Sequence, residues 1–329
     1  MRNTQPNRTC MRGFDAEFTD LPHYIRVITD RIWEGRRIGD IHRYYSDPCI
    51  VETPLGVSTR VSEVISGTEA TLKMFPDRRL LAEDIIVSGD DQHCYLSSHR
   101  IISPMTHTGD GSFGPATGKK VHARTIADCV CKDNRIIHEW LVRDHAAIAY
   151  AIGGTPKALA ARWLRERGCW RKPDAGNAPD GYQSHISDSA LATQYAATIA
   201  GFATGQDVAT GMIEIYDEAV HQIAPGEAHH YGRAELRSFW QSLFSAFAVE
   251  HFTVEHLAEN LSADRGTRLA LRWRARAKHV ASGTAGRRFG DATGRGVEIM
   301  GINHVEVVSG KIFREWVLID EVALWMQVL

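Results

Sequence analysis

Two stretches of the chain place ionisable and aromatic residues at every second position, the spacing that puts side chains on one face of a β-strand. The first contains His138, Trp140 and Asp144, and the second contains Trp316 and Asp320. If this face lines an apolar cavity, desolvation raises the pKa of each aspartate toward the range useful for moving protons. Asp144 and Asp320 are therefore candidate general acid/base residues. The alternative is that each aspartate ends a strand and caps the helix that follows.

Two histidines, His107 and His279, each end an expected strand just before a loop. A histidine there can hydrogen-bond a catalytic aspartate, or polarise a substrate carbonyl as the neutral imidazole. We take both as candidate catalytic residues. The alternative is a solvated residue that begins a loop.

Eight further side chains are candidates for contact with a substrate, because they are polar or aromatic and fall on expected strands or near a cavity entrance. They are Trp140, Trp316, His304, Asp128, His122, Tyr44, Tyr216 and Glu52. Core packing is the alternative for the tryptophans and tyrosines. For His304 the strand register leaves Asn303 as a competitor. Glu52 and His122 differ from their partners in the second half, so two sites would not be identical.

Motifs for nucleotide, serine-nucleophile and zinc chemistry are absent from the sequence. It contains no Walker loop, no GxSxG and no HExxH. The six cysteines are scattered, and Cys129-x-Cys131 is not a zinc or redox signature. We therefore expect no metal and no cofactor, which leaves cofactor-free proton transfer.

An internal repeat organises the elements that must position these residues. A shift of 172 residues aligns the two halves through about 65 residues, and after a loop of different length a shift of 176 aligns about 30 more. The aligned pairs include Tyr44/Tyr216, Glu63/Glu235, Arg100/Arg272, His107/His279, Ile126/Ile302, Trp140/Trp316 and Asp144/Asp320. The chain is a duplication.

Hydrophobic periodicity predicts helices first and strands after in each half. The expected helices are Leu21–Trp33, Gly39–Tyr45, Val61–Phe75, 155–167, Ser189–Thr204, Gln206–Tyr216 and Gly232–Phe244. The expected strands are Leu80–Ser88, His93–Ser103, Lys120–Cys131, Arg135–Asp144, His251–Leu257, Arg268–His279, Gly296–Val308 and Lys311–Asp320. This order predicts an α+β unit with helices on one face of a curved antiparallel sheet. We expect domains at 14–153 and 182–329, joined by a helix and linker at 154–181.

The second half resembles the SnoaL-like polyketide cyclase family, within the nuclear transport factor 2-like superfamily. The resemblance rests on Gly232–Trp240, Thr293–Glu298 and Ser309–Asp320, and the first half keeps the last block as Asn134–Asp144. The first half has Arg60-Val61 where the second has a Gly-Arg pair. The resemblance implies two cone-shaped α+β barrel domains in tandem, with the motif aspartate as general acid/base. Relatives pair through their sheets, which implies an intramolecular pseudo-dimer or a homodimer.

Composition and charge fit a cytoplasmic globular protein. The chain has 329 residues, 43% of them hydrophobic, and a formal net charge of −2, so no global field favours nucleic acid or an anionic membrane. No apolar run reaches the length needed to cross a bilayer, and the basic start lacks the apolar stretch of a signal peptide. A small molecule is the expected partner.

Three functional hypotheses follow. The leading one is a cofactor-independent cyclase, isomerase, dehydratase or lyase that acts on a small apolar substrate bearing a carbonyl or hydroxyl group. The opposed one is a non-catalytic scaffold that binds a small ligand or dimerises. The third combines one catalytic cone with one degenerate cone. The environment of the two aspartates discriminates between them.

Overall fold

The computed structural model describes residues 11–174 and 176–329, and contains two six-stranded mixed sheets of identical topology. Their strand orders are β2-β1-β6-β5-β4-β3 and β8-β7-β12-β11-β10-β9. In each sheet the first long strand runs parallel to the last one, and the other neighbours are antiparallel. The expectation of an α+β tandem fold is confirmed.

The N-terminal unit runs from α1 to α4. Its elements are α1 (Leu21–Trp33), η1 (Ile38–Asp40), α2 (Ile41–Tyr44), β1 (Tyr45–Thr53), β2 (Gly56–Ser58), α3 (Val61–Met74), β3 (Leu81–Asp90), β4 (Cys94–Thr106), β5 (Lys120–Lys132), β6 (Arg135–Arg143) and α4 (His145–Ala151). Helix α5 (Pro156–Arg167) follows and packs against the last helix of the chain.

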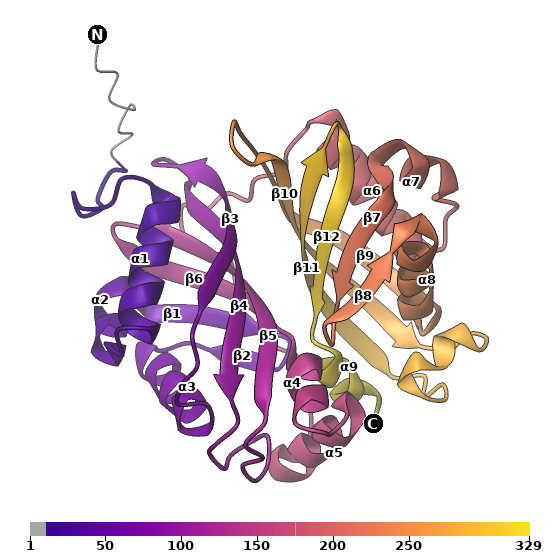
Figure 1. Cartoon of the computed structure of the whole chain (residues 1–329), viewed down its shortest axis with the longest axis horizontal. Helices are drawn as coiled ribbons and strands as arrows, with labels where there is room; N and C mark the ends of the chain where they lie inside the picture. The colour runs from indigo at the N-terminus through magenta and orange to yellow at the C-terminus, as the bar shows by residue number, and fades with distance from the viewer. Residues whose placement is uncertain (1–10, 175) are drawn as a thin grey trace.

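The C-terminal unit repeats this order. Its elements are α6 (Ala190–Thr204), α7 (Ala209–Ile215), β7 (Tyr216–Ala224), β8 (Ala228–Tyr231), α8 (Gly232–Ser245), β9 (Phe247–Ser262), β10 (Gly266–His279), η2 (Ala285–Phe289), β11 (Gly296–Val308), β12 (Lys311–Ile319) and α9 (Glu321–Val328). In Figure 1, helices α1–α3 and α6–α8 lie on opposite outer sides, while the two sheets face each other between them.

Local sequence explains the helices. Asp20 caps α1 by accepting from the N–H of His23, and residues at helical spacing, such as Tyr24 and Ile28, are buried against the sheet. Helix α8 buries a continuous apolar stripe that includes Trp240 and Phe244. In α3 the corresponding stripe is interrupted, and Thr68 is one of only three buried residues on that helix.

Strands β1 and β7 are not among the strands expected from the sequence. Tyr45 pairs with Ile136 on β6, and Tyr216 pairs with Ile312 on β12. Since Ile136 and Ile312 match under the 176-residue shift, the structural counterpart of Tyr216 is Tyr45 and not Tyr44. One residue of length difference before α3 accounts for this offset.

The two sheets pack against each other through the faces that their helices do not cover (Figure 1), and the contact between them is reciprocal. The guanidinium of Arg100 lies 3.4 Å from the ring centre of Trp316, and that of Arg272 lies 3.6 Å from the ring centre of Trp140. These residues match under the repeat, so each unit contributes one cation and one indole. Apolar side chains of both sheets complete the interface, among them Val142, Ile126, Ile302 and Leu318.

A buried ion pair crosses the same interface. Arg272 donates to the Asp128 carboxylate at 2.6 Å, with both side chains almost fully buried. Removing one partner of such a pair leaves a buried charge without compensation, which is strongly destabilising.

We expect Asp128→Ala to lower the free energy of unfolding by about 3–5 kcal/mol, because the buried Arg272 guanidinium loses its shortest ion pair and keeps only Glu255, 3.2 Å from Nε. The control is Glu166→Ala, which breaks the exposed i,i+4 pair with Arg162 and should cost less than about 1 kcal/mol. Urea denaturation followed by circular dichroism measures both values. Equal losses for the two variants would contradict a stabilising role for the buried pair.

Candidate active site

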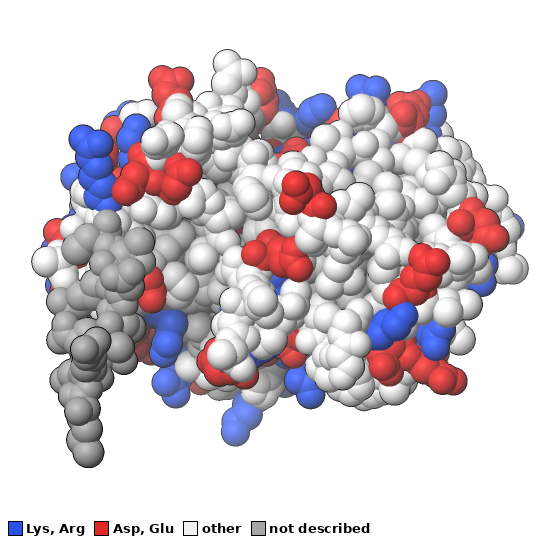
Figure 2. Space-filling model, turned by 90° about the horizontal axis from the view of Figure 1, so that it is seen from above, with Lys and Arg blue, Asp and Glu red and all other residues white. Residues whose placement is uncertain are grey.

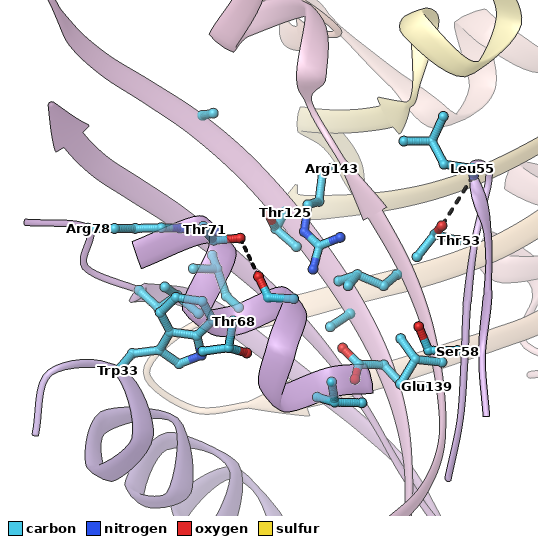
Figure 3. Close-up of a pocket in the computed structure, with 18 of the residues that line it drawn as sticks. Trp33, Thr53, Leu55, Ser58, Thr68, Thr71, Arg78, Thr125, Glu139 and Arg143 are labelled. Atoms are coloured by element: carbon cyan, nitrogen blue, oxygen red, sulfur yellow. Dashed lines mark hydrogen bonds between the residues drawn. The ribbon is translucent and has the colours of Figure 1, made fainter. Parts of the chain in front are cut away.

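A cavity of about 490 Å³ lies inside the N-terminal unit, between the concave face of the sheet and helices α1 and α3. Its walls combine apolar side chains with threonines and a few charged groups. Figure 3 shows Thr68 and Thr71 on the helix side, with Glu139 and Arg143 on the sheet side. The volume falls within the range of small-molecule sites.

Smaller side chains on α3 open this cavity. Under the 172-residue shift, the α8 residues Phe239, Trp240, Leu243 and Phe244 correspond to Gly67, Thr68, Thr71 and Leu72 on α3. The four large side chains of α8 are buried in the core of the C-terminal unit. Their small counterparts leave the equivalent space of the N-terminal unit unfilled.

The interior of the C-terminal unit is packed, and its buried glutamate is hydrogen-bonded. Trp273 lies against Gly301, where an added Cβ would approach the indole to 2.3 Å. Glu315 accepts from the hydroxyls of Tyr195 at 2.7 Å and Tyr216 at 3.0 Å, and from the Gln222 amide at 2.7 Å. These contacts indicate a structural role for Glu315.

The alternation along β6 runs opposite to the sequence expectation. Glu139, Leu141 and Arg143 line the cavity, whereas Trp140 and Val142 pack in the interface with the other sheet. Trp140, predicted to face the cone, therefore faces the partner sheet, whereas Asp144, just beyond the end of β6, lines the cavity. The reason is that both faces of β6 are buried, so apolar periodicity could not distinguish them.

Glu139 and Arg143 are charged groups without a direct ion pair inside the described part of the chain. Glu139 accepts one hydrogen bond, from Tyr45 at 3.3 Å, and burial raises its pKa. Burial lowers the pKa of Arg143, against the opposing effect of the charges of Glu139 and Asp320. The surface that Arg143 retains faces the cavity, as Figure 3 shows.

Asp144 lines the cavity and also caps α4. Its carboxylate accepts from the N–H groups of Ala147 at 2.8 Å and Gly226 at 2.8 Å, and from that of Glu227 at 3.3 Å. Burial raises the pKa of Asp144 to about 7, although the backbone donors of Ala147 and Gly226 lower it. Asp144 thus makes the contacts of a helix cap, and two of the N–H groups that donate to it belong to the C-terminal unit.

Asp320, in the C-terminal unit, contacts His145 of the N-terminal unit. Its Oδ1 accepts from the N–H groups of Val322 and Ala323 at the start of α9, and its Oδ2 lies 2.7 Å from Nδ1 of His145. His145 lines the cavity and packs against the rings of Phe113 and Trp163. A carboxylate from one unit therefore orients an imidazole on the cavity wall of the other.

The tautomer of His145 follows from this contact. A carboxylate carries no hydrogen and can only accept, so its contact with the imidazole assigns the proton to Nδ1. In the neutral ring Nε2 then holds a lone pair, and no described residue hydrogen-bonds to it. This is the arrangement of a general base whose orientation is fixed by a carboxylate.

Five residues expected to bind substrate lie between the sheets, away from the cavity. Trp140 and Trp316 stack on arginines, and His304 accepts or donates a hydrogen bond with Ser98 at 2.8 Å. Asp128 pairs with Arg272, and Glu52 pairs with Arg274. The neighbour of His304, Asn303, points the other way and bonds to Tyr195 and Trp273 inside the C-terminal unit.

The remaining expected residues also lie away from the cavity walls. His122 is exposed, Tyr44 is buried and accepts from Arg31 at 2.6 Å, and Tyr216 bonds to Glu315. His107 and His279 occupy matching positions, each buried with its Nδ1 next to a threonine hydroxyl, Thr117 at 3.2 Å and Thr293 at 3.1 Å. This repeated geometry anchors the loop after each strand.

Sequence reasoning missed the residues that share the cavity, namely Glu139, Arg143, His145 and Arg78. One signal was available in the repeat. Under the 176-residue shift Arg143 corresponds to Ile319, and His145 corresponds to Glu321. Arg143, a charged side chain in place of the apolar Ile319, marks the unit whose interior is polar.

Within residues 11–174 and 176–329, no group of three or more histidine, cysteine, aspartate or glutamate side chains is arranged to hold a metal ion. None of the described helices has the length and apolar character required to cross a membrane. On the face seen in Figure 2, acidic and basic side chains are interspersed.

Comparisons with known proteins identify the family. The profile of the SnoaL-like polyketide cyclase family matches residues 24–152, and that of the SnoaL-like domain matches residues 195–315. The chain therefore consists of two SnoaL-like domains in tandem. This membership supports a cyclase-type role in general terms. No protein of curated function matches the chain significantly.

Solved structures are similar to part of the chain. IdmH from Streptomyces antibioticus, provisionally described as a polyketide cyclase, is 17% identical, with 40% of this chain and 97% of that protein covered and a TM-score of 0.35. AclR from Streptomyces galilaeus, provisionally described as a hydroxylase, is 17% identical, with 45% and 91% covered and a TM-score of 0.36. A SnoaL-like polyketide cyclase from Agrobacterium tumefaciens is 18% identical, with 40% and 97% covered and a TM-score of 0.33.

The raised pKa of Asp144 predicts a pH dependence of stability. Its pKa is about 7 in the folded protein, above the ordinary value of 3.8, so the folded state binds this proton more tightly than the unfolded state. Between these two values the contribution of Asp144 to stability falls as the pH rises. Asp144→Asn lacks this contribution, so we expect the free energy of unfolding of the wild type minus that of the variant to decrease across the window.

Urea denaturation of both proteins at a series of pH values measures this difference, and other titrating groups cancel in the subtraction. A difference that increases with pH would contradict the expectation. It would mean that the backbone donors outweigh burial and hold the carboxylate charged.

Proposed function

We propose that this protein is an enzyme that moves a proton at a carbon atom next to a carbonyl group, as cyclases and isomerases do, and that the cavity of the N-terminal unit is its active site. The observation that carries the proposal is the His145–Asp320 pair on the cavity wall. A buried carboxylate on Nδ1 leaves Nε2 free to act as a base on a residue that lines the cavity.

Arg143 supports this chemistry because it lies two residues before His145 and faces the same cavity. When Nε2 of His145 removes a proton from carbon, the electron pair moves toward the carbonyl oxygen. A fixed guanidinium in a site with little water stabilises that developing negative charge. The charge of Asp320 acts on Arg143 as well, which indicates that the three groups form one cluster.

A ring closure can follow from the same enolate. Its carbon attacks a second carbonyl of the same molecule, a carbon–carbon bond forms, and the new alkoxide takes the proton back from the His145 imidazolium. The base is thereby regenerated, and protons and electrons balance without another reactant. Return of the proton to a different carbon of the enolate gives an isomerase instead.

In this proposal the C-terminal unit has no cavity chemistry of its own. Its interior is filled by aromatic side chains, and its Glu315 is held by three hydrogen bonds. It supplies Asp320 and the backbone donors of Gly226 and Glu227 to the N-terminal site. The arrangement corresponds to one catalytic unit completed by one structural unit.

The test uses a simple carbon acid. We expect the protein to accelerate exchange of the α-hydrogens of 2-tetralone for deuterium in D₂O, followed by proton NMR. His145→Gln should lower the protein-dependent rate by about 10²–10⁴-fold, since the general base is lost. Asp320→Asn should lower it by about 10²-fold, because an amide no longer fixes the tautomer.

His93→Gln is the matched control, because His93 is exposed and pairs with Asp90 on the surface. Its exchange rate should equal that of the wild type within about twofold. If His145→Gln and His93→Gln exchange equally fast, His145 is not the base. Circular dichroism spectra establish that each variant is folded.

A further inference from the structure

Arg78 is a buried cation on the cavity wall that the proton-transfer chemistry does not use. It lies between α3 and β3, with 7% of its surface exposed, and lines the cavity with Trp33. Figure 3 shows Arg78 and Trp33 together on one side of the cavity, away from Thr53 and Leu55. A side chain of this length and charge is rarely buried unless it has a partner.

The protein itself supplies little compensation for this charge. Nε and Nη2 of Arg78 both point to the Ser103 hydroxyl at 3.4 Å, a long distance for a hydrogen bond. The guanidinium lies over the indole of Trp33, 4.9 Å from the ring centre. In the part of the chain that the structure describes, no acidic side chain forms an ion pair with Arg78.

The charged groups near Arg78 do little to neutralise its positive charge. Glu34 acts on Arg78 only at a distance, and its Oε1 is occupied by the N–H of Leu80 at 2.7 Å. The positive charge of Arg143 adds to burial in lowering the pKa of Arg78, to about 9. Burial also raises the pKa of Glu139, which disfavours its charged form. Arg78 and Arg143 therefore share the cavity, and neither forms an ion pair with a carboxylate in the described part of the chain.

We propose that Arg78 is the anchor for a carboxylate of the ligand, so that the substrate class is an aromatic or alicyclic acid. The planar guanidinium, oriented by Ser103 and the face of Trp33, matches the two oxygens of a carboxylate. The apolar body of the ligand then lies along the threonines and isoleucines of α1 and α3. As a statement about substrate, the inference rests on the proposed function.

The C-terminal unit lacks this anchor. The residue that matches Arg78 under the 172-residue shift is Glu250, which is exposed and pairs with Arg276 and Lys278. Arg78 is thus a feature of the hollow unit alone, as expected for a group that serves a ligand.

The experiment compares 2-naphthoate with 2-naphthamide, which have nearly the same shape but differ in charge. Isothermal titration calorimetry with the whole chain should give at least tenfold tighter binding of the acid. Arg78→Gln should bring the two affinities within about twofold, while Arg78→Lys should retain part of the preference. Unchanged affinity for the amide shows that the cavity of a variant is intact.

Two further variants separate this inference from the proposed function. His145→Gln should keep the preference for the acid, because that residue acts on a proton and not on the carboxylate. If the protein prefers the acid but shows no exchange activity, the role of Arg78 as carboxylate anchor is supported and the proposed enzymatic function is wrong. Equal affinities in the wild type, absence of naphthoate binding, or loss of the preference in Arg143→Gln but not in Arg78→Gln would overturn the anchor.

Discussion

The stacking of Arg272 on Trp140, and of Arg100 on Trp316, determines which side chains of the sheets are left to line the cavity. Because side chains alternate along a strand, the residues that dock the two sheets cannot also line a cavity. Docking takes Trp140 and Val142, so β6 presents Glu139, Leu141 and Arg143 to the interior. The same contact brings the ends of β6 and β12 together, where the pair of His145 and Asp320 bridges the units.

The two units show how one fold divides its roles. In the C-terminal unit Trp240 and Trp273 fill the interior, and a glutamate is locked among tyrosines. In the N-terminal unit the residue that matches Trp240 is Thr68, and the glutamate keeps a single donor. Packing density gives stability to one unit, whereas the space left in the other gives room for a ligand.

Sequence reasoning recovered the duplication, the α+β class and most element boundaries, because repeats, helical spacing and hairpin turns are local signals. It did not recover which face of β6 points inward, since a strand buried on both sides carries no polar alternation to read. It named Asp320 but not its partner, because His145 lies 175 positions away and only the docking of the sheets joins them. The sequence predicts that the polar residues His304 and Asp128 face the cavity, but both contact residues of the other sheet.

The central claim is that Asp320 of one unit fixes the imidazole of His145, a residue that lines the cavity of the other unit. The ¹⁵N chemical shifts of the His145 ring measure this most directly, assigned by comparison with His145→Gln. The account predicts a proton on Nδ1 that is held by Asp320, and a change in the ring shifts in Asp320→Asn. A ring protonated on Nε2 in the wild type, or shifts that do not respond to Asp320→Asn, would contradict it.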